Sequence, residues 1–126
     1  MLVTHDYIGD AIIHATSKIL GVCPLEIKNL HIPFDDADPD LLLTEADSLV
    51  RALDKGDGVL VLTDMYGATP SNIAHRLVGD EHLKVVTGLN LPMLMRVMNY
   101  PALDINELVE KAIAGGREGI IINRRK

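Results

Sequence analysis

The chain lacks the residues that would let it cross-link itself or build a sulfur-ligated metal site. Its 126 residues include a single cysteine, Cys23, which excludes an internal disulfide and a cysteine-based zinc site. A lone thiol is more often a small buried hydrophobe than a nucleophile, so we expect Cys23 to be buried. This use of cysteine suits a reducing cytosol, and we expect a cytoplasmic protein.

The chain also lacks a basic excess, a long apolar run and a leader. Its formal net charge is −6, whereas proteins that bind nucleic-acid backbones carry a clustered positive excess. No apolar stretch approaches the roughly 18 residues of a membrane-spanning helix. The opening MLVTHDYIGD has neither the basic start nor the continuous apolar core of a signal peptide. We therefore expect no nucleic-acid partner and no membrane insertion.

The chain does contain a regular alternation of apolar runs and helical patterns. Such alternation is typical of βαβ units around a parallel sheet. The predicted strands are residues 2–4, 25–30, 58–63, 83–87 and 120–123, and the predicted helices are 8–21, 39–54, 69–77, 90–98 and 107–113. At this length we expect one domain, residues 1–126, with a flavodoxin-like open α/β sheet of parallel strands, flanking helices and a C-terminal edge strand.

Helix starts and helix faces also follow from the sequence. Four residues are placed to cap helices: Asp38, Thr69, Asn90 and Asp104. Apolar residues that recur every three or four positions predict the buried faces. For the first helix these are Ile8, Ile12, Ala15 and Ile19, and for the second they are Leu42, Ala46, Leu49, Val50 and Leu53.

Two polar side chains, His5 and Asp64, follow predicted strands. The stretch VLVLTDMYGATPSN, residues 59–72, runs from a buried strand through Asp64 into a helix that starts at Thr69-Pro70. Parallel strands finish at one edge of a sheet, so the ends of these strands should meet there. If the first and third strands are neighbours, His5 and Asp64 come within hydrogen-bond reach of each other.

Each of these residues has a plainer interpretation when it is taken alone. A histidine after a strand is more often structural than chemical, and Asp64 suits a turn or a cap. Thr69-Pro70 and Asn90 suit helix starts. The other histidines have no spacing that indicates a zinc site, and three methionines are expected to fill the core: His14, His31, His75 and His82, and Met93, Met95 and Met98. The combination at one edge is what indicates a site.

Together these residues indicate chemistry on a phosphoryl group. A carboxylate that accepts the Nδ1–H of His5 would fix the tautomer and leave Nε2 as a nucleophile. Gly67 lets the backbone turn, and the amides of Gly67, Ala68 and Thr69 at a helix start form an anion site to which the Thr69 hydroxyl adds a donor. Phosphoryl transfer to and from an imidazole needs mainly positioning and charge neutralisation, so no metal or cofactor is expected.

Three segments resemble one known family. They are LVTHDYIGDAIIHATSKILG with the strand-terminal histidine, VLVLTDMYGATPSNIAHRL close to Asp-x-x-Gly-Gly-Thr/Ser-Pro-x-Asn, and VVTGLNLPMLMRVMN close to Ser/Thr-Gly-x-Asn-x-Pro-Met-Leu. In this order and at this spacing, nearly the whole chain resembles the mannose-type enzyme IIA components of the bacterial phosphoenolpyruvate-dependent sugar phosphotransferase system.

The resemblance implies a phosphoryl carrier. Its members take phosphate from the histidine-containing phosphocarrier protein, here onto Nε2 of His5, and pass it to a IIB component. Asp64 would hold the other ring nitrogen, and Thr69 with nearby amides would hold phosphoryl oxygens. Members are homodimers that exchange their last strand, which here would be residues 120–123, with GGREG at 115–119 as the hinge.

The sequence departs from the family pattern at three points. Ala68 replaces the second glycine of the phosphate loop; it still supplies an amide but disfavours a positive φ. Asp6 replaces a glycine after the histidine and adds negative charge beside the anion site, which could slow transfer or shift its equilibrium. Most members also begin several apolar residues earlier, so we expect a short first strand from a late start codon or a shortened chain.

Two other functions fit parts of the pattern. A phospho-aspartate receiver domain of the same fold would use Asp64 and Thr87, but it would need an acidic pair where this chain has His5-Asp6, and a lysine after its last strand. A regulatory protein of the same fold would use phosphorylation of His5 only to switch its binding to another protein. The sequence does not name the sugar, because specificity in such systems belongs to the membrane component.

Overall fold

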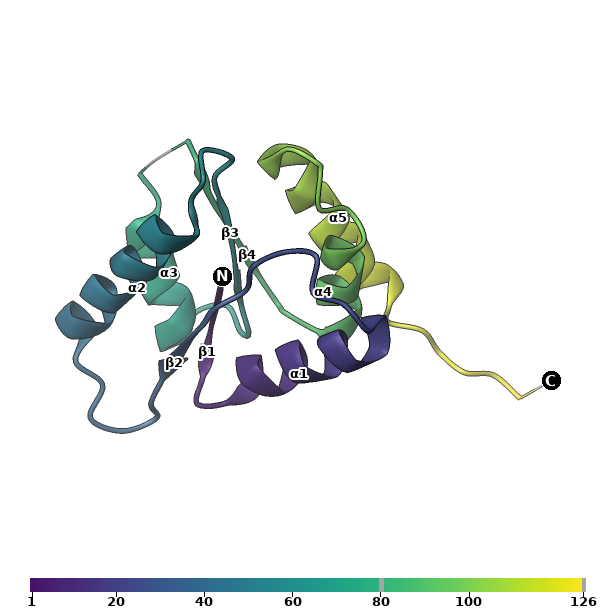
Figure 1. Ribbon diagram of the computed structural model, residues 1–126. Coiled ribbons are helices and arrows are strands. Elements are labelled where there is room, and N and C mark those ends of the chain that lie inside the picture. The colour runs from purple at the N-terminus through teal and green to yellow at the C-terminus, as the bar shows by residue number, and fades with distance from the viewer. Residues whose placement is uncertain (80, 126) are drawn as a thin grey trace.

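The computed structural model describes residues 1–79 and 81–125 and shows an open α/β sheet (Figure 1). Within these residues the elements are, in chain order, β1 (Leu2–His5), α1 (Ile8–Leu20), β2 (Asn29–Ile32), α2 (Pro39–Leu53), β3 (Val59–Thr63), α3 (Thr69–Leu77), β4 (Leu83–Thr87), α4 (Leu91–Met98) and α5 (Ile105–Glu118). The strands are parallel and lie in the order β2-β1-β3-β4. This is the predicted flavodoxin-like order, and it makes β1 and β3 neighbours.

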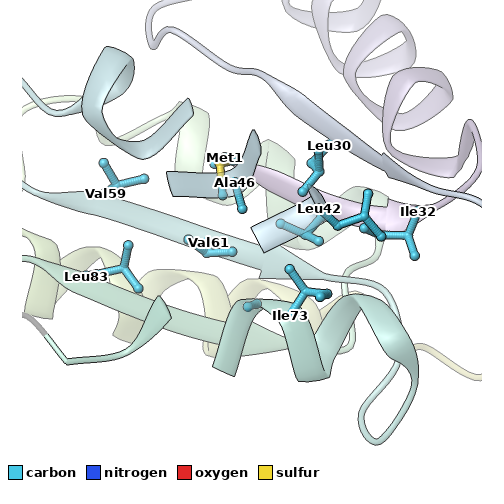
Figure 2. Close-up of a cluster of buried hydrophobic side chains, with 11 residues drawn as sticks. Met1, Leu30, Ile32, Leu42, Ala46, Val59, Val61, Ile73 and Leu83 are labelled. Atoms are coloured by element: carbon cyan, nitrogen blue, oxygen red, sulfur yellow. The ribbon is translucent and has the colours of Figure 1, made fainter. Parts of the chain in front are cut away.

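Helices cover both faces of the sheet, and each face has its own hydrophobic core (Figure 1). Figure 2 shows the first core, where Val61 of β3 lies among side chains that include Leu42 of α2 and Ile73 of α3. On the other face Leu62 of β3 packs in a cluster with Leu94 of α4 and residues of α1 and α5. Because side chains alternate along a strand, consecutive residues serve opposite cores, and β3 is buried throughout, as predicted for a central parallel strand.

The helix starts follow the predicted caps at three of four positions. The side chains of Asp38, Asn90 and Asp104 each accept a backbone N–H from the first turn of their helix. At the fourth position the prediction was wrong, because Ala68 is the N-cap and Thr69 is the first residue of α3. None of the helices in the described ranges has the length and apolarity to cross a membrane.

The second strand begins four residues later than predicted and ends two residues later. The sequence indicated residues 25–30, whereas β2 spans Asn29–Ile32 and pairs with β1 from Leu2↔Asn29 to His5↔Ile32. Leu25 and Ile27 alternate as in a strand, but they are partly buried against the cluster of α4 and α5. Their apolar pattern therefore reflects a loop that covers the core, and the pairing with β1 sets the true register.

The buried face of α1 is displaced by one residue from the predicted stripe. Ile8 and Ile19 are exposed, whereas Gly9 and Thr16 are buried. A Cβ at position 9 would lie 2.2 Å from the Asn29 side chain, so glycine lets the helix approach β2 closely and rotates its face. Cys23, in the loop after α1, is exposed, which corrects the expectation that it would be buried.

The last helix is longer than predicted and includes most of the supposed hinge. The prediction ended the helix at 113, but α5 continues to Glu118 through the two glycines at 115 and 116. A Cβ at Gly115 would lie 2.4 Å from Cβ of Arg96 on α4. These glycines allow α4 and α5 to pack closely, which is why they sit inside a helix despite their low helix propensity. Residues 120–125 form no strand in the described chain, and the exchange that the sequence predicts between subunits stays a prediction.

Candidate functional site

His5 and Asp64 meet at the carboxyl edge of the sheet. His5 is the last residue of β1, Asp64 directly follows β3, and the two strands are paired. The Nδ1 atom of His5 lies 2.9 Å from Oδ2 of Asp64. The His5 side chain is 17% exposed and that of Asp64 is 11% exposed. The two side chains are thus in direct contact at the position that the strand pattern predicts.

The carboxylate of Asp64 is held from several sides. Oδ2 accepts the backbone N–H of His5 at 2.9 Å as well as its ring nitrogen, and Oδ1 accepts the backbone N–H of Met65 at 2.9 Å. A carboxylate only accepts hydrogen bonds, so Nδ1 carries the proton in this contact and the neutral ring keeps its lone pair on Nε2. The geometry therefore provides an oriented imidazole with one nucleophilic nitrogen.

A third side chain, Phe34, contacts the histidine, and no pattern in the sequence predicted this contact. The two rings stack with centroids 5.0 Å apart and planes 11° apart. Phe34 lies in the loop between β2 and α2, two residues beyond Ile32, which pairs with His5. The pairing of His5 with Ile32 would have indicated that Phe34 lies near the histidine. The predicted strand ended at residue 30, so the sequence did not reveal this pairing.

The loop from Asp64 to α3 contains the predicted phosphate-binding residues Gly67 and Ala68, and Thr69 follows them. Gly67 has a φ of +81°, which suits glycine, and Ala68 is extended with φ −89° and ψ 171°. The alanine that replaces the family's second glycine is therefore unstrained. Thr69 is exposed at the first position of α3, where the amides of a helix start have no acceptor within the helix.

The other departure, Asp6, does carry strain. Its φ is +44°, in the left-handed region that glycine adopts most easily. Its backbone N–H donates to the carbonyl of Ile32 at 2.9 Å, which ties the end of β1 to the end of β2. The positive φ explains why the family pattern has a glycine at this position. In this chain an aspartate adopts the same conformation.

The chain between His5 and α1 is also fixed by hydrogen bonds. The Gly9 N–H donates to Oγ1 of Thr4 at 2.9 Å, and that hydroxyl donates to Oδ1 of Asn29 at 3.1 Å. Thr4 is fully buried. The segment that follows the histidine is therefore anchored to both β1 and β2, so the position of the imidazole does not depend on a loose loop.

The remaining histidines lie away from the His5–Asp64 contact. His14 and His75 are exposed on α1 and α3, and His82 is exposed before β4. His31 follows the predicted strand 25–30, but it lies within β2, where its Nε2 contacts Oδ2 of Asp10. The described residues contain no group of three or more side chains of histidine, cysteine, aspartate or glutamate that could hold a metal ion.

Apolar side chains are exposed on the segments that surround the imidazole. Tyr7 and Ile8 follow β1, Met65 and Tyr66 follow Asp64, and Phe34 covers the ring. We call these five residues the apolar rim. Of these residues, Phe34 stacks on His5 and Tyr7 contacts the ring of His31 on the neighbouring strand.

The family model described as "PTS system fructose IIA component" matches residues 1–113. The PTS system mannose-specific EIIAB component of Escherichia coli strain K12 is 32% identical over 126 residues, which cover 93% of this chain and 36% of that protein. The chain thus spans about a third of that relative's length. The PTS system sorbose-specific EIIA component of Lacticaseibacillus casei is 32% identical over 113 residues, which cover 86% of this chain and 78% of that protein.

Solved structures show the same fold. The phosphotransferase system component EIIA from Streptococcus agalactiae superposes with a TM-score of 0.76 at 29% identity, over 96% of this chain and 93% of that chain. The mannose/sorbose specific IIA subunit from Enterococcus faecalis has a TM-score of 0.87 at 21% identity, over 99% and 93% of the two chains. Because the family model covers nearly the whole chain and curated relatives share about a third of its residues, this protein belongs to the mannose-type EIIA family of the sugar phosphotransferase system.

Proposed function

We propose that this EIIA protein is a phosphoryl carrier that works through a phosphohistidine at His5. It accepts the group from the histidine-containing phosphocarrier protein and passes it to a IIB component. The observation that carries the proposal is the contact between Nδ1 of His5 and the fixed carboxylate of Asp64, which leaves Nε2 for the reaction. Membership of the family favours this function over that of a phospho-aspartate receiver domain.

The proposed step is an exchange of one nitrogen–phosphorus bond for another. The Nε2 lone pair of His5 attacks phosphorus as the bond to the phosphocarrier's histidine breaks, and the leaving imidazole keeps the electron pair. Because Nδ1 retains its proton, the phosphorylated ring carries a positive charge, and the Asp64 carboxylate 2.9 Å away stabilises it. In the second transfer a nucleophile of the IIB component attacks phosphorus as the bond to Nε2 of His5 breaks, and Nε2 regains its lone pair.

The proposed phosphate-binding residues are Gly67, Ala68 and Thr69. They form the turn that leads from the Asp64 loop into α3, and a helix start favours an anion through its amides and its dipole. Strand alternation places His5 on the same face of β1 as Val3, which packs in the core that α3 covers. This places the imidazole on the side of the sheet where α3 begins.

The apolar rim is the proposed contact surface for both protein partners. The reacting nitrogen of one protein must reach the phosphorus held by the other, so the two surfaces have to meet around the histidine. Large exposed side chains such as Tyr66 and Met65 bury apolar area in such a contact without altering the core. The same surface would serve donor and acceptor in turn.

A homodimer with an exchanged C-terminal strand is also proposed. Ile120, Ile121 and Ile122 are exposed after α5, which is unfavourable for three consecutive isoleucines in water. β4 ends the sheet, and grooves run along it on both sides, one lined by Val85 with residues of α3 and the other by Val86 with residues of α5. A strand from a second copy would cover this edge.

The direct test is phosphorylation with phosphoenolpyruvate, enzyme I and the phosphocarrier protein, followed by mass spectrometry that locates the phosphate. We expect the label on His5, stable in alkali and lost in acid, and transferable to a purified IIB domain. Label on another residue would overturn the site. Label on His5 that no IIB domain accepts would instead indicate the regulatory alternative.

The dimer is tested by truncation after Gly119, which removes the isoleucines and keeps all of α5. Sedimentation should show a dimer for the whole chain and a monomer or aggregate for the truncated one. An unchanged dimer would refute strand exchange. Truncation after Gly116 would be less informative, because it also removes the last turn of α5.

A further inference from the structure

The contact between Phe34 and His5 is the one interaction of the imidazole that the proposed chemistry has not yet used. The ring planes are 11° apart and the centroids 5.0 Å apart, which is an offset stack. Phe34 is 70% exposed and lies outside the two core clusters. Phe34 thus contributes little to the core but stacks on the reacting ring. Its role is therefore better sought in the chemistry of that ring than in the stability of the fold.

The loop that carries Phe34 is held at both ends. Before it, Ile32 pairs with His5, and its carbonyl accepts the N–H of Asp6 at 2.9 Å. Pro33 then restricts the backbone. After it, the Asp38 side chain accepts the N–H of Asp40 at 3.0 Å and begins α2. The phenyl ring is therefore presented to the imidazole by a segment whose two ends are fixed to the sheet and to a helix.

The hydrogen bond to Asp64 fixes one atom of the imidazole but leaves the ring free to tilt about that contact. A flat ring stacked on one face removes this freedom, because tilting would separate the two surfaces or bring them into collision. One contact thus sets where Nδ1 lies, and the other sets the plane in which Nε2 extends.

We propose that Phe34 is a positioning residue for phosphoryl transfer, which holds the His5 imidazole in the plane where Nδ1 meets Asp64 and Nε2 lies open to the incoming phosphorus. This inference rests on the proposed function. It assigns a role in catalysis to a side chain that is mostly exposed. Because small misplacements of a reacting group reduce rates substantially, the stack is expected to act on the transfer step itself.

The test compares Phe34→Leu, which keeps an apolar side chain but loses the flat ring, with Phe34→Tyr and Phe34→Trp, which keep an aromatic ring. Tyr100→Leu is the matched control. It removes an aromatic ring that makes a cation–π contact with the ammonium group of Lys111, away from the site. Since Phe34 is exposed, all variants should fold, and circular dichroism with thermal melting checks this.

The first readout is the pair of ring-nitrogen chemical shifts of His5, measured by nuclear magnetic resonance in the free protein. We expect the whole chain to show the tautomer protonated at Nδ1. In Phe34→Leu the ring can tilt, which weakens its hydrogen bond to Asp64, so both nitrogen shifts should move part of the way toward the average of the two tautomers. Phe34→Tyr should restore the original values. Unchanged shifts in Phe34→Leu would overturn the positioning role. This readout needs no phosphorylation.

The second readout is the rate of transfer from the phosphocarrier protein, with kcat and KM separated. From the usual contribution of an aromatic pair, Phe34→Leu should lower kcat roughly two- to tenfold. The aromatic variants should recover it, and Tyr100→Leu should match the unaltered chain. A change in KM alone would make Phe34 only a contact for the partner. If the unaltered chain takes no phosphate on His5, the proposed function fails, while the nitrogen shifts still decide the role of Phe34.

Discussion

Two histidine–aspartate pairs have their histidines on the neighbouring strands β1 and β2, and they share little beyond their residue types. In the first, Nδ1 of His5 contacts Asp64, and the side chains are 17% and 11% exposed. In the second, Nε2 of His31 contacts Asp10, and the side chains are 48% and 47% exposed. The first pair leaves its outer ring nitrogen available, whereas the second has that nitrogen occupied.

The difference shows that backbone placement, rather than residue type, decides what such a pair can do. The Asp64 carboxylate is held by the backbone N–H groups of His5 and Met65, so it lies against the main chain and meets the nearer ring nitrogen. Asp10 reaches across from α1 and meets the outer nitrogen of His31. Only the first arrangement presents Nε2 to a partner, and only that pair is sheltered from water.

The largest expected effect comes from removing each histidine in turn. His5→Ala should abolish labelling by the phosphocarrier protein, because it removes the nucleophilic nitrogen, whereas His31→Ala should be labelled like the unaltered chain. Mass spectrometry after a fixed incubation measures both, and circular dichroism confirms folding. Label that persists on His5→Ala, or is lost from His31→Ala, would reverse the assignment of the two pairs.

The next effect comes from removing each carboxylate's charge. Asp64→Asn keeps the shape but loses the charge that orients and stabilises the imidazolium, and the transfer rate should fall on the order of a hundredfold or more, by analogy with the aspartate of a catalytic triad. Asp10→Asn should leave the rate unchanged. Rapid-quench kinetics measures both variants. Equal rates for Asp64→Asn and the unaltered chain would show that the contact is not part of the mechanism.

A smaller effect is expected at Asp6, in the loop that connects the two pairs. Asp6→Gly removes the strain of φ +44°, and the free energy of unfolding should rise by about 1 kcal/mol. Urea denaturation measures this. Asp6→Asn separates charge from strain, because asparagine tolerates the same conformation, so it should alter phosphoryl transfer without the gain in stability. Equal stability of Asp6→Gly and the unaltered chain would mean that the turn is not strained.

The smallest effect is expected from breaking the second pair for its stability alone. The contact between His31 and Asp10 is an ion pair only when the imidazole is protonated, and an ion pair this exposed contributes about 0–1 kcal/mol and is screened by salt. Asp10→Ala should therefore change the free energy of unfolding by less than about 1 kcal/mol, and less still at high salt. Denaturation at low and high salt measures this. A loss of several times that size would show that α1 depends on this contact to stay on β2.

Some elements could be predicted closely because their signals are local. The bounds of α3 and β4 match the prediction, since Thr69-Pro70 marks a helix start and residues 83–87 form an uninterrupted strand pattern. Asn90 caps α4 as expected, with its side chain accepting the N–H of Met93 at 2.9 Å. In each case a few adjacent residues are enough to predict where the element begins or ends.

Other elements could not be predicted because distant partners decide them. The register of β2 is set by its pairing with β1. Leu25 and Ile27 alternate as strand residues do, but they lie in a loop that packs against the core. The glycines of α5 indicate a break in the sequence, yet contact with α4 makes them suitable inside a helix. Phe34 reaches His5 only through that pairing of β1 with β2, so no local pattern points to it.

The sequence by itself determined the alternation of strands and helices, the parallel sheet, and the placement of His5 and Asp64 at the same edge, because parallel strands must end at one edge. Only the tertiary structure decided that β1 and β3 are neighbours, which face of α1 is buried and which side chain stacks on the imidazole. These features depend on strand register and on close packing between segments far apart in the chain. Such contacts produce no periodic pattern in the sequence of the residues that make them.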